Sequence, residues 1–292
     1  MAVLFDWGTY NALSTLRNAE LIGCKLTEIP PYEFSRRSRT EQYFESYRKA
    51  CEGVFTTVTA HAPYYAIVSD RPDSLERSLR GLKRAVRMAR IAGAEIFNLH
   101  IGGILEDREK AIDVAADSVK QLLQEAGDMY ISLETTYTYH LLGSIEDIRA
   151  IIEKVGSEKV IISLQLENDF MRELGVWKDG NFIRANSEAT EDFWINLFRK
   201  ALELGGGFLS LRFSQVTGVY LRRFLLKKRV PLGKGYPDVR PLARALARFL
   251  VRLLEGGYKV RAHLIYTGRP ETKYRDTIEL YSAVMKEAVE YL

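Results

Sequence analysis

Residues 56–100 read TTVTAHAPYYAIVSDRPDSLERSLRGLKRAVRMARIAGAEIFNLH, and this stretch decides the fold. Two short runs rich in β-forming residues, Thr56–Ala60 and Glu95–His100, flank a longer segment with the spacing of an amphipathic helix. A strand, a loop, a helix and a second strand in this order are what a right-handed βαβ crossover requires. The stretch therefore predicts two neighbouring parallel strands joined by a helix.

The helix of this unit has signals of its own at both ends. Its apolar positions step along the chain by four and three, as the buried face of a helix does, and they are Leu75, Leu79, Leu82, Val86 and Ala89. Asp73 and Glu76 have the spacing of a capping box at the helix start. Gly93 is predicted to lie just past the helix, where glycine commonly ends one.

The same alternation continues from one end of the chain to the other. Eight strands are predicted, at Val3–Trp7, Lys25–Ile29, Thr56–Ala60, Glu95–His100, Tyr130–Glu134, Val160–Gln165, Phe208–Phe213 and Lys259–Tyr266. Further helices are predicted at about Asp107–Glu125, before Gly127, and at about Glu271–Tyr291. Eight strands close a parallel barrel, so residues 1–292 are predicted to form one α/β domain, a single (β/α)8 TIM barrel.

One connection is longer than a minimal crossover needs. Residues 214–257 separate the seventh and eighth predicted strands and contain GVYLRRFLLKKRVPLGKGYPD before their helix. An insertion at the carboxyl end of a barrel strand is commonly a substrate loop, and the alternative is a simple surface excursion.

The charge of the chain is nearly balanced overall but uneven along its length. Lys and Arg number 42 against 38 Asp and Glu, and the net charge of +4 does not by itself indicate a polyanionic partner. Between Glu203 and Asp238 no acidic residue occurs, and the basic residues there are Arg212, Arg222, Arg223, Lys227, Lys228, Arg229 and Lys234. This basic segment is either a phosphate-facing surface or a solvated loop.

The composition, 47% hydrophobic and 27% charged, is typical of a soluble globular protein. Cys24 and Cys51 have no metal-binding spacing, which agrees with a reduced cytosolic compartment. The N-terminus lacks the basic start of a signal peptide, and no apolar run is long enough to span a membrane. We therefore expect a cytoplasmic protein without membrane contact, and its few Gln, Cys and Met residues are typical of thermophiles.

Polar residues stand at the predicted strand ends, where a buried hydrophobic strand has no packing reason to place them. They are Asp6, Glu28, His61, His100, Glu134, Gln165, Ser210 and Arg212. In a (β/α)8 barrel the carboxyl ends of the strands meet at the mouth where chemistry occurs. His61, His100 and Glu134 follow three adjacent strands, and two imidazoles with one carboxylate favour a zinc or manganese site. The alternative is three unrelated residues that bond to nearby backbone.

The other two histidines carry weaker signals. His140 is predicted to be solvated in a loop. His263 lies in the middle of the eighth predicted strand, and it faces the helices if Tyr266 faces the barrel interior.

Several blocks of sequence resemble the endonuclease IV family. These blocks are HAPYY at 61–65, DSLERSL at 73–79, NLHIGG at 98–103, SLETT at 132–136 and LGKG at 232–235, and their order covers nearly the whole chain. The resemblance implies a (β/α)8 barrel that cleaves DNA 5′ to abasic sites with three clustered metal ions, usually zinc. The wider xylose isomerase-like superfamily shares the barrel and some of these positions.

The first half of the chain matches the family's functional residues. By this resemblance His61, His100 and Glu134 correspond to two histidine ligands and the bridging glutamate, and Glu134 would hold both metal and water in catalysis. Tyr64 corresponds to the tyrosine near the damaged nucleotide. Arg36 or Arg37 lies in the loop after the second strand, which touches DNA in the family.

The second half departs from the family pattern. Six of the nine implied ligand positions are replaced, and the chain there reads Gln165, Leu166, Glu167 and Asn168, then Ser210, then Lys227 and Arg229, then Tyr266. Amides are weak neutral ligands, and cationic side chains repel a metal ion. We therefore expect fewer than three ions, zinc or manganese, with one held by the surviving ligands and Gln165 as a weak fourth ligand.

The basic replacements suggest a role with phosphate. Arg212 and Arg229 would hold a phosphate in the space of the missing metals, and the residues from Lys227 to Lys234 would contact the DNA backbone. The alternative is that these arginines pair with neighbouring carboxylates.

Three functions remain open from the sequence. The first is a metal-dependent phosphodiesterase of DNA repair, acting on abasic or damaged DNA. The second is a DNA-binding homologue that has lost catalysis, which the replaced ligands favour. The third is a sugar isomerase or epimerase of the same superfamily, and it ranks lowest because only Glu134 remains of the ligand set expected on strands five to eight. The oligomeric state is not indicated.

Overall fold

Eight parallel strands close into a barrel in this computed structural model, which describes residues 3–36, 38–178, 181–185, 188–221 and 224–292. In order around the barrel the strands are β1 (Val3–Tyr10), β14 (Val260–Tyr266), β11 (Phe208–Phe213), β8 (Val160–Gln165), β6 (Tyr130–Glu134), β4 (Ile96–Leu99), β3 (Thr57–His61) and β2 (Leu26–Ile29). Each overlaps one of the eight predicted strands. The single (β/α)8 barrel is confirmed.

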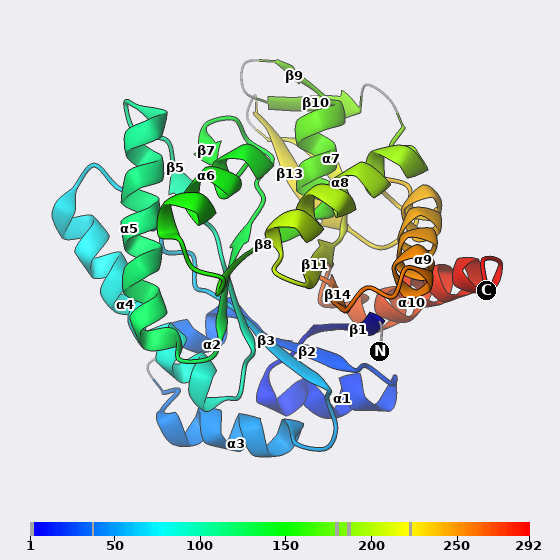
Figure 1. Ribbon diagram of the computed structural model, residues 1–292, viewed down its shortest axis with the longest axis horizontal. Coiled ribbons are helices and arrows are strands. Elements are labelled where there is room, and N and C mark those ends of the chain that lie inside the picture. Colours follow the sequence, from blue (N-terminus) through cyan, green and yellow to red (C-terminus); the bar gives the residue numbers. More distant parts are fainter. Residues whose placement is uncertain (1–2, 37, 179–180, 186–187, 222–223) are drawn as a thin grey trace.

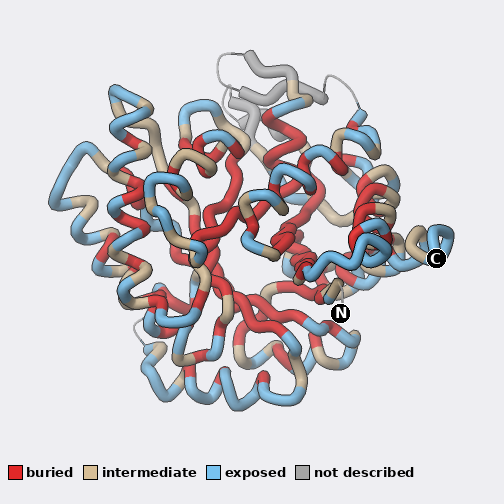
Figure 2. Tube along the Cα trace, viewed as in Figure 1, coloured by how far each residue is buried: buried red, intermediate tan, exposed pale blue. Residues whose placement is uncertain are grey.

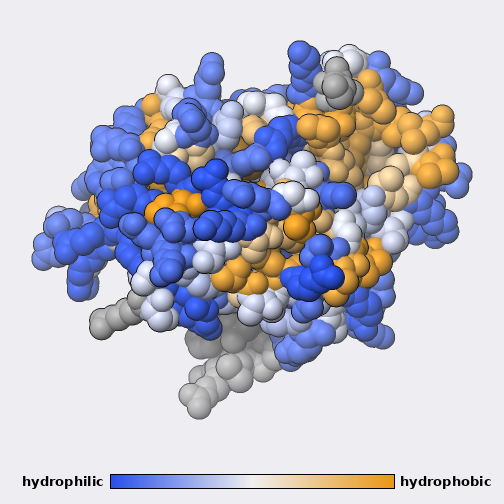
Figure 3. Space-filling view, turned by 90° about the horizontal axis from the view of Figure 1, so that it is seen from below, coloured by the Kyte–Doolittle hydropathy of each residue, from blue (hydrophilic) through white to orange (hydrophobic). Residues whose placement is uncertain are grey.

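Helices surround the barrel and bury their apolar faces against it (Figures 1 and 2). They are α1 (Leu16–Leu21), α2 (Pro31–Ser35), α3 (Glu41–Cys51), α4 (Pro72–Ile91), α5 (Arg108–Ala126), α6 (Ile145–Val155), α7 (Leu166–Leu174), α8 (Glu191–Leu204), α9 (Val239–Glu255) and α10 (Lys273–Val289), with a short 3-10 turn, η1 (Leu13–Thr15). The face seen from below is mostly hydrophilic, with orange patches toward one side (Figure 3). None of the helices in the described ranges is both long and apolar enough to cross a membrane.

Helix α4 confirms the predicted signal at its C-terminal end and not the one at its start. The predicted capping box of Asp73 and Glu76 is wrong, because the helix begins at Pro72 and its N-cap is Arg71, without a side-chain hydrogen bond. Proline at the first helical position fixes a helical backbone there, so Asp73 already lies inside the helix. Gly93 does follow the helix directly, with a φ of 77° that favours glycine.

The barrel interior is polar at mid-depth. Strand register aligns Glu134 with Ser163, Ser163 with Ser210, and Ser210 with His263, across β6, β8, β11 and β14. The hydroxyl groups of Ser163 and Ser210 lie 3.0 Å apart inside the barrel, and residues aligned in parallel strands face the same side. His263 therefore faces the interior.

Tyr266 faces the other way. Its hydroxyl donates a hydrogen bond of 2.9 Å to Asp276 of α10, outside the barrel. Because Tyr266 and His263 are three residues apart on one strand, they take opposite faces. His263 was expected to face the helices only if Tyr266 faced the interior, and Tyr266 faces α10 instead.

Two-stranded hairpins lie at the carboxyl end of the barrel strands. The predicted long connection 214–257 forms β12 (Gln215–Leu221) and β13 (Phe224–Val230), which pair antiparallel, followed by α9. A second hairpin, β9 (Gly175–Lys178) with β10 (Asn181–Ala185), contacts β13 (Figure 1). A two-residue pairing of β5 (Gly102–Gly103) with β7 (Leu141–Leu142) completes this side.

Candidate metal centre

Three adjacent strands bring His61, His100 and Glu134 together at the barrel mouth. His61 ends β3, Glu134 ends β6, and His100 follows β4. One ligand atom from each side chain lies within 4.8 Å of the other two. The Nε2 atom of His61 is 3.4 Å from Oε2 of Glu134, and Nδ1 of His100 is 3.6 Å from Oε1. This donor set fits zinc or manganese and leaves coordination positions for water and substrate.

His61 is oriented by its neighbour along the chain. Its Nδ1 atom lies 2.8 Å from the carbonyl oxygen of Ala62. When Nδ1–H donates to that oxygen, Nε2 keeps a lone pair directed toward Glu134, which is the arrangement of a metal-binding histidine.

The protonation states agree with metal binding. Burial lowers the pKa of His100 to about 4, although the nearby Glu134 offsets part of this effect, so the imidazole is neutral near pH 7. Burial alone would raise the pKa of Glu134, but His100, Arg212 and His61 hold it well below its usual range. The site thus presents a neutral imidazole at His100 and an ionised carboxylate at Glu134.

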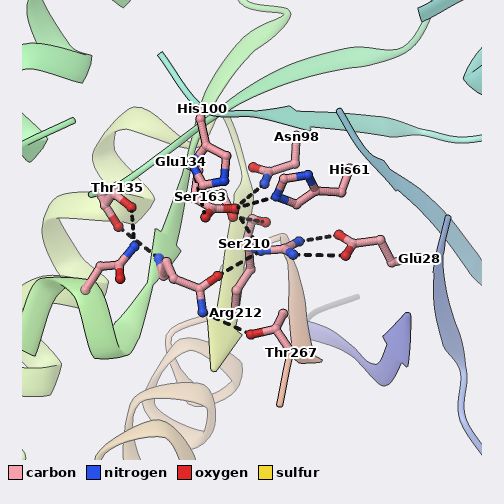
Figure 4. A network of polar contacts seen from close by, with 12 residues as sticks. Glu28, His61, Asn98, His100, Glu134, Thr135, Ser163, Ser210, Arg212 and Thr267 are labelled. Atoms are coloured by element: carbon pink, nitrogen blue, oxygen red, sulfur yellow. Dashed lines mark hydrogen bonds and ion pairs between the residues drawn. The ribbon is translucent and has the colours of Figure 1, made fainter. Parts of the chain in front are cut away.

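Asn98 is a member of the site that the sequence did not single out. Its amide nitrogen donates to Oε2 of Glu134 from β4 (Figure 4). The signal was present in NLH at 98–100, because Asn98 precedes His100 by two residues in the predicted strand Glu95–His100, and residues two apart in a strand face the same way.

Arg212 of β11 reaches into the same centre, and each of its three guanidinium nitrogens contacts an acceptor. Its guanidinium forms a two-pronged ion pair with Glu28, in which Nη2 lies 2.9 Å from Oε1 (Figure 4). Its Nε atom is 3.0 Å from Oε2 of Glu134. Burial opposes the charge of Arg212, but the carboxylates of Glu28 and Glu134 raise its pKa above the ordinary value. For this arginine the structure therefore has the carboxylate pairing that the sequence left as the alternative to a phosphate contact.

Gln165 is turned toward Arg212. Its side-chain oxygen accepts a hydrogen bond of 3.1 Å from Nε of Arg212. Its amide nitrogen donates to Glu167 at 2.7 Å and to Thr267 at 3.1 Å. The amide thus bridges Arg212 to a third acidic group, Glu167, and the Gln165 side-chain oxygen is already hydrogen-bonded to Arg212.

Lys227 is a second, half-buried cation of the site and belongs to the β12–β13 hairpin. Its ammonium group lies 3.2 Å from Oε1 of Glu167, contacts the side-chain oxygen of Asn168, and stands over the Tyr137 ring. Burial lowers the pKa of Lys227, and Glu167 offsets part of this effect. Lys227 therefore faces the interior of the mouth, and the long connection folds back over the site.

Comparison with known proteins places the barrel in a family. The family model described as xylose isomerase-like TIM barrel matches residues 16–252, most of the chain. The chain belongs to the xylose isomerase-like TIM barrel family.

Relatives of this xylose isomerase-like barrel include one that spans nearly its whole length. An uncharacterized protein from Methanocaldococcus jannaschii is 40% identical over 293 residues, which cover 99% of this chain and 92% of that protein. A probable endonuclease 4 from Metamycoplasma arthritidis is 25% identical over 148 residues, which cover 48% of this chain and 53% of that protein.

Solved structures of the xylose isomerase-like fold come from different kinds of enzyme. Endonuclease IV from Thermus thermophilus has a TM-score of 0.67 at 15% identity, covering 97% of this chain and 100% of its own. D-Psicose 3-epimerase from Clostridium cellulolyticum has a TM-score of 0.66 at 11% identity, covering 98% and 99%. At these identities the likeness shows the fold alone.

The rim of this xylose isomerase-like barrel holds the other predicted contacts. Tyr64 is 73% exposed, and its ring stacks on His100 with centroids 5.5 Å apart. Arg36 is exposed beside Glu33, and Arg37 lies outside the described residues. Lys234 is exposed on the turn after β13, and His140 is also exposed, as predicted.

A cavity of about 280 Å³ opens next to the candidate metal centre. It is lined by His61, the Glu28–Arg212 ion pair and Arg229. The other lining residues are mostly aromatic rings and prolines, namely Tyr10, Pro30, Pro31, Tyr32, Tyr64, Thr267, Gly268, Arg269 and Pro270. The cavity thus joins the candidate ligands to a partly cationic, partly aromatic wall.

Proposed function

We propose that this chain binds one divalent metal ion, zinc or manganese, at His61, His100 and Glu134, and hydrolyses phosphodiester bonds at abasic or damaged sites in DNA. The observation that carries the proposal is the convergence of these three ligand atoms within 4.8 Å at the barrel mouth. A bound ion supplies Lewis acidity, which polarises a phosphoryl oxygen and acidifies a water molecule. Glu134 would hold the ion and would be the group placed to accept a proton from a water molecule beside it.

The surroundings of the three residues support a nucleic acid as the substrate. The exposed ring of Tyr64 stacks on His100 and offers a free face on which a nucleobase can stack. Arg229 lies on the cavity wall, and Arg36 and Lys234 are exposed. Such cations contact phosphates and position a strand without reading its sequence. The partial likeness to a probable endonuclease 4 supports the same substrate.

A second candidate is a DNA-binding protein without catalysis. The observation that favours it is Arg212, whose Nε lies 3.0 Å from Oε2 of Glu134. A fixed positive charge on a ligand oxygen weakens both metal binding and proton acceptance. A sugar isomerase ranks last, because β8 and β11 bring Gln165 and Arg212 to the mouth, where acidic or histidine ligands are expected.

Glu134→Gln tests the catalytic proposal. The chelator-treated protein is loaded with Zn²⁺ or Mn²⁺ and incubated with a duplex that contains one abasic site. Nicking is expected with metal, and Glu134→Gln lowers its rate by roughly 100-fold or more, because the amide is a weak ligand and no base. Glu106→Gln, which changes an exposed glutamate, is the matched control.

Metal content and DNA affinity separate the two candidates. One ion per chain together with nicking supports the phosphodiesterase. Salt-sensitive DNA affinity that is the same in chelator, without nicking, supports the binding protein. Absence of both nicking and DNA binding would contradict both.

A further inference from the structure

The guanidinium of Arg212 sits in a cage of oxygen atoms. Both carboxylate oxygens of Glu28, Oε2 of Glu134 and the side-chain oxygen of Gln165 surround it. The contacts with Oε1 of Glu28, Glu134 and Gln165 measure 2.9, 3.0 and 3.1 Å. These acceptors come from three strands, β2, β6 and β8, and Arg212 comes from a fourth (Figure 4). All four side chains are buried, so the cage is part of the barrel interior.

The cage borders the candidate metal ligands directly. Oε2 of Glu134 lies 3.4 Å from Nε2 of His61 on one side and 3.0 Å from Nε of Arg212 on the other. One carboxylate thus faces two cation positions, one lined by imidazoles and one lined by oxygens.

The chemistry of the cage is that of a hard-cation site. Carboxylate and amide oxygens are the donors that Mg²⁺, Mn²⁺ and Ca²⁺ prefer. A guanidinium cannot lose its proton in a protein and satisfies two carboxylates with several donors at once. Arg212 is therefore a permanent occupant of a position that a divalent ion would otherwise suit.

We propose that Arg212 is a built-in cation that fills a second cation site, bounded by Glu28, Glu134 and Gln165, and thereby limits the centre to one metal ion. The proposal rests on the metal site of the proposed function. It makes Arg212 a specificity-determining residue for metal stoichiometry rather than a phosphate contact.

Charge balance supports the limit. Glu28 and Glu134 carry two negative charges around one guanidinium, which leaves one negative charge in their shared space. One divalent ion on the imidazole side adds two positive charges, so the net charge of the group becomes +1. A net positive charge suits an anionic phosphodiester. A second divalent ion beside Arg212 would add like charges at close range in a buried site, which is strongly unfavourable.

The test removes the positive charge of Arg212 and measures how many Mn²⁺ ions the chain then binds. Mn²⁺ per chain is measured by equilibrium dialysis and elemental analysis for the wild type, Arg212→Gln, Arg212→Lys and Arg80→Gln. One ion is expected in the wild type and in Arg212→Lys, which keeps the charge. Arg80 is an exposed arginine, so Arg80→Gln also keeps one ion. Two ions are expected in Arg212→Gln, because two buried carboxylates lose their partner.

The outcomes separate this inference from the proposed function. One ion in both the wild type and Arg212→Gln, bound with equal affinity, overturns the role of Arg212 and leaves the metal site standing. No ion in the wild type but one in Arg212→Gln supports the cage and overturns the native metal site. Two ions in Arg212→Lys, or none in any variant, contradict the inference.

Glu28→Gln provides a second test in case Arg212→Gln does not fold. Glu28 neutralises one side of the guanidinium, so its amide variant leaves more of the positive charge facing Glu134. The dissociation constant for Mn²⁺ is expected to rise about tenfold or more through Coulomb repulsion. An unchanged dissociation constant would show that the charge of Arg212 does not act on the metal site.

Discussion

His263 places an imidazole in the barrel interior without a hydrogen-bonding partner. The residue is buried, and neither ring nitrogen has such a partner among the described residues. Burial, followed by the charge of Arg261, lowers its pKa to about 3, far below the ordinary value of 6.5. The folded protein therefore holds this histidine neutral near pH 7.

This shift predicts a pH dependence of stability. Below pH 6.5 the unfolded chain takes up a proton at His263 that the folded chain refuses until about pH 3, so the free energy of unfolding falls as the pH falls through this window. Between these two pH values His263 lowers the free energy of unfolding by about 1.4 kcal/mol for each pH unit of acidification, and above pH 6.5 it has no such effect. Urea unfolding at several pH values should show a shallower acid decline for His263→Leu than for the wild type.

The exposed histidine provides the control. The stability of His140→Gln should decline with acid as steeply as that of the wild type, because His140 is exposed and its replacement leaves the buried His263 in place. Equal slopes for His263→Leu and the wild type would contradict the burial of a neutral His263.

At the level of residues, the sequence predicted some of the site and missed the rest. The meeting of His61, His100 and Glu134 follows from one rule, that parallel strands bring their carboxyl ends together. The partner of Arg212 could not be predicted in this way, because Glu28 lies 184 residues away and several carboxylates stood at strand ends. The face of His263 depended on a strand parity that local sequence leaves open.

Helix starts are set by backbone geometry as much as by side-chain motifs. In α4 the Asp73 and Glu76 pair has the right spacing, yet Pro72 occupies the first helical position and makes Arg71 the N-cap. In α6 the N-cap Ser144 and Asp147 form a complete capping box. Spacing alone does not distinguish these two cases, because the first helical residue must also be known.

The uncapped start of α4 predicts a stabilising substitution. Arg71→Ser should raise the free energy of unfolding by about 0.5–1 kcal/mol, because a serine hydroxyl can accept from a free amide of the first turn. Arg77→Ser, the same change within the helix, should lower it slightly, since serine is a poorer helix former than arginine. Chemical denaturation measures both, and a loss of stability in Arg71→Ser would contradict the assigned N-cap.

The strands were easier to predict than the hairpins above them. Each barrel strand is a short run rich in β-forming residues, and all eight were predicted from the alternation of such runs with segments of helical spacing. The β12–β13 hairpin lies in a segment that was predicted only as a long insertion, because its basic residues suggested a solvated loop as well as a surface. The buried contact of Lys227 with Glu167 is a tertiary effect that no local pattern encodes.

For the whole molecule, closure of the barrel depends on the pairing of its first and last strands. Strand β1 pairs with β14 in seven register positions from Val3–Val260 to Thr9–Tyr266. The hydroxyl of Thr9 also donates to the carbonyl oxygen of Tyr266 at 2.7 Å. The barrel therefore cannot close until both ends of the sequence are present.

Truncation tests this dependence. A chain that ends at Gly256 lacks β14 and α10, so β1 and β11 lose their shared neighbour and buried apolar side chains become exposed. No cooperative thermal unfolding transition is expected for it. A chain that lacks only the exposed residues Glu290, Tyr291 and Leu292 should unfold like the full protein. Cooperative unfolding of the shorter chain would contradict the structural role of β14.

The order of the strands along the chain also sets the order in which the centre is assembled during synthesis. His61, His100 and Glu134 leave the ribosome before Arg212, and β14 follows last. A growing chain therefore carries the three candidate ligands while the oxygen cage still lacks its guanidinium. In the proposed metal site, a divalent ion and Arg212 would compete for Glu134, and Arg212 would enter that competition only after the three candidate ligands have been synthesised.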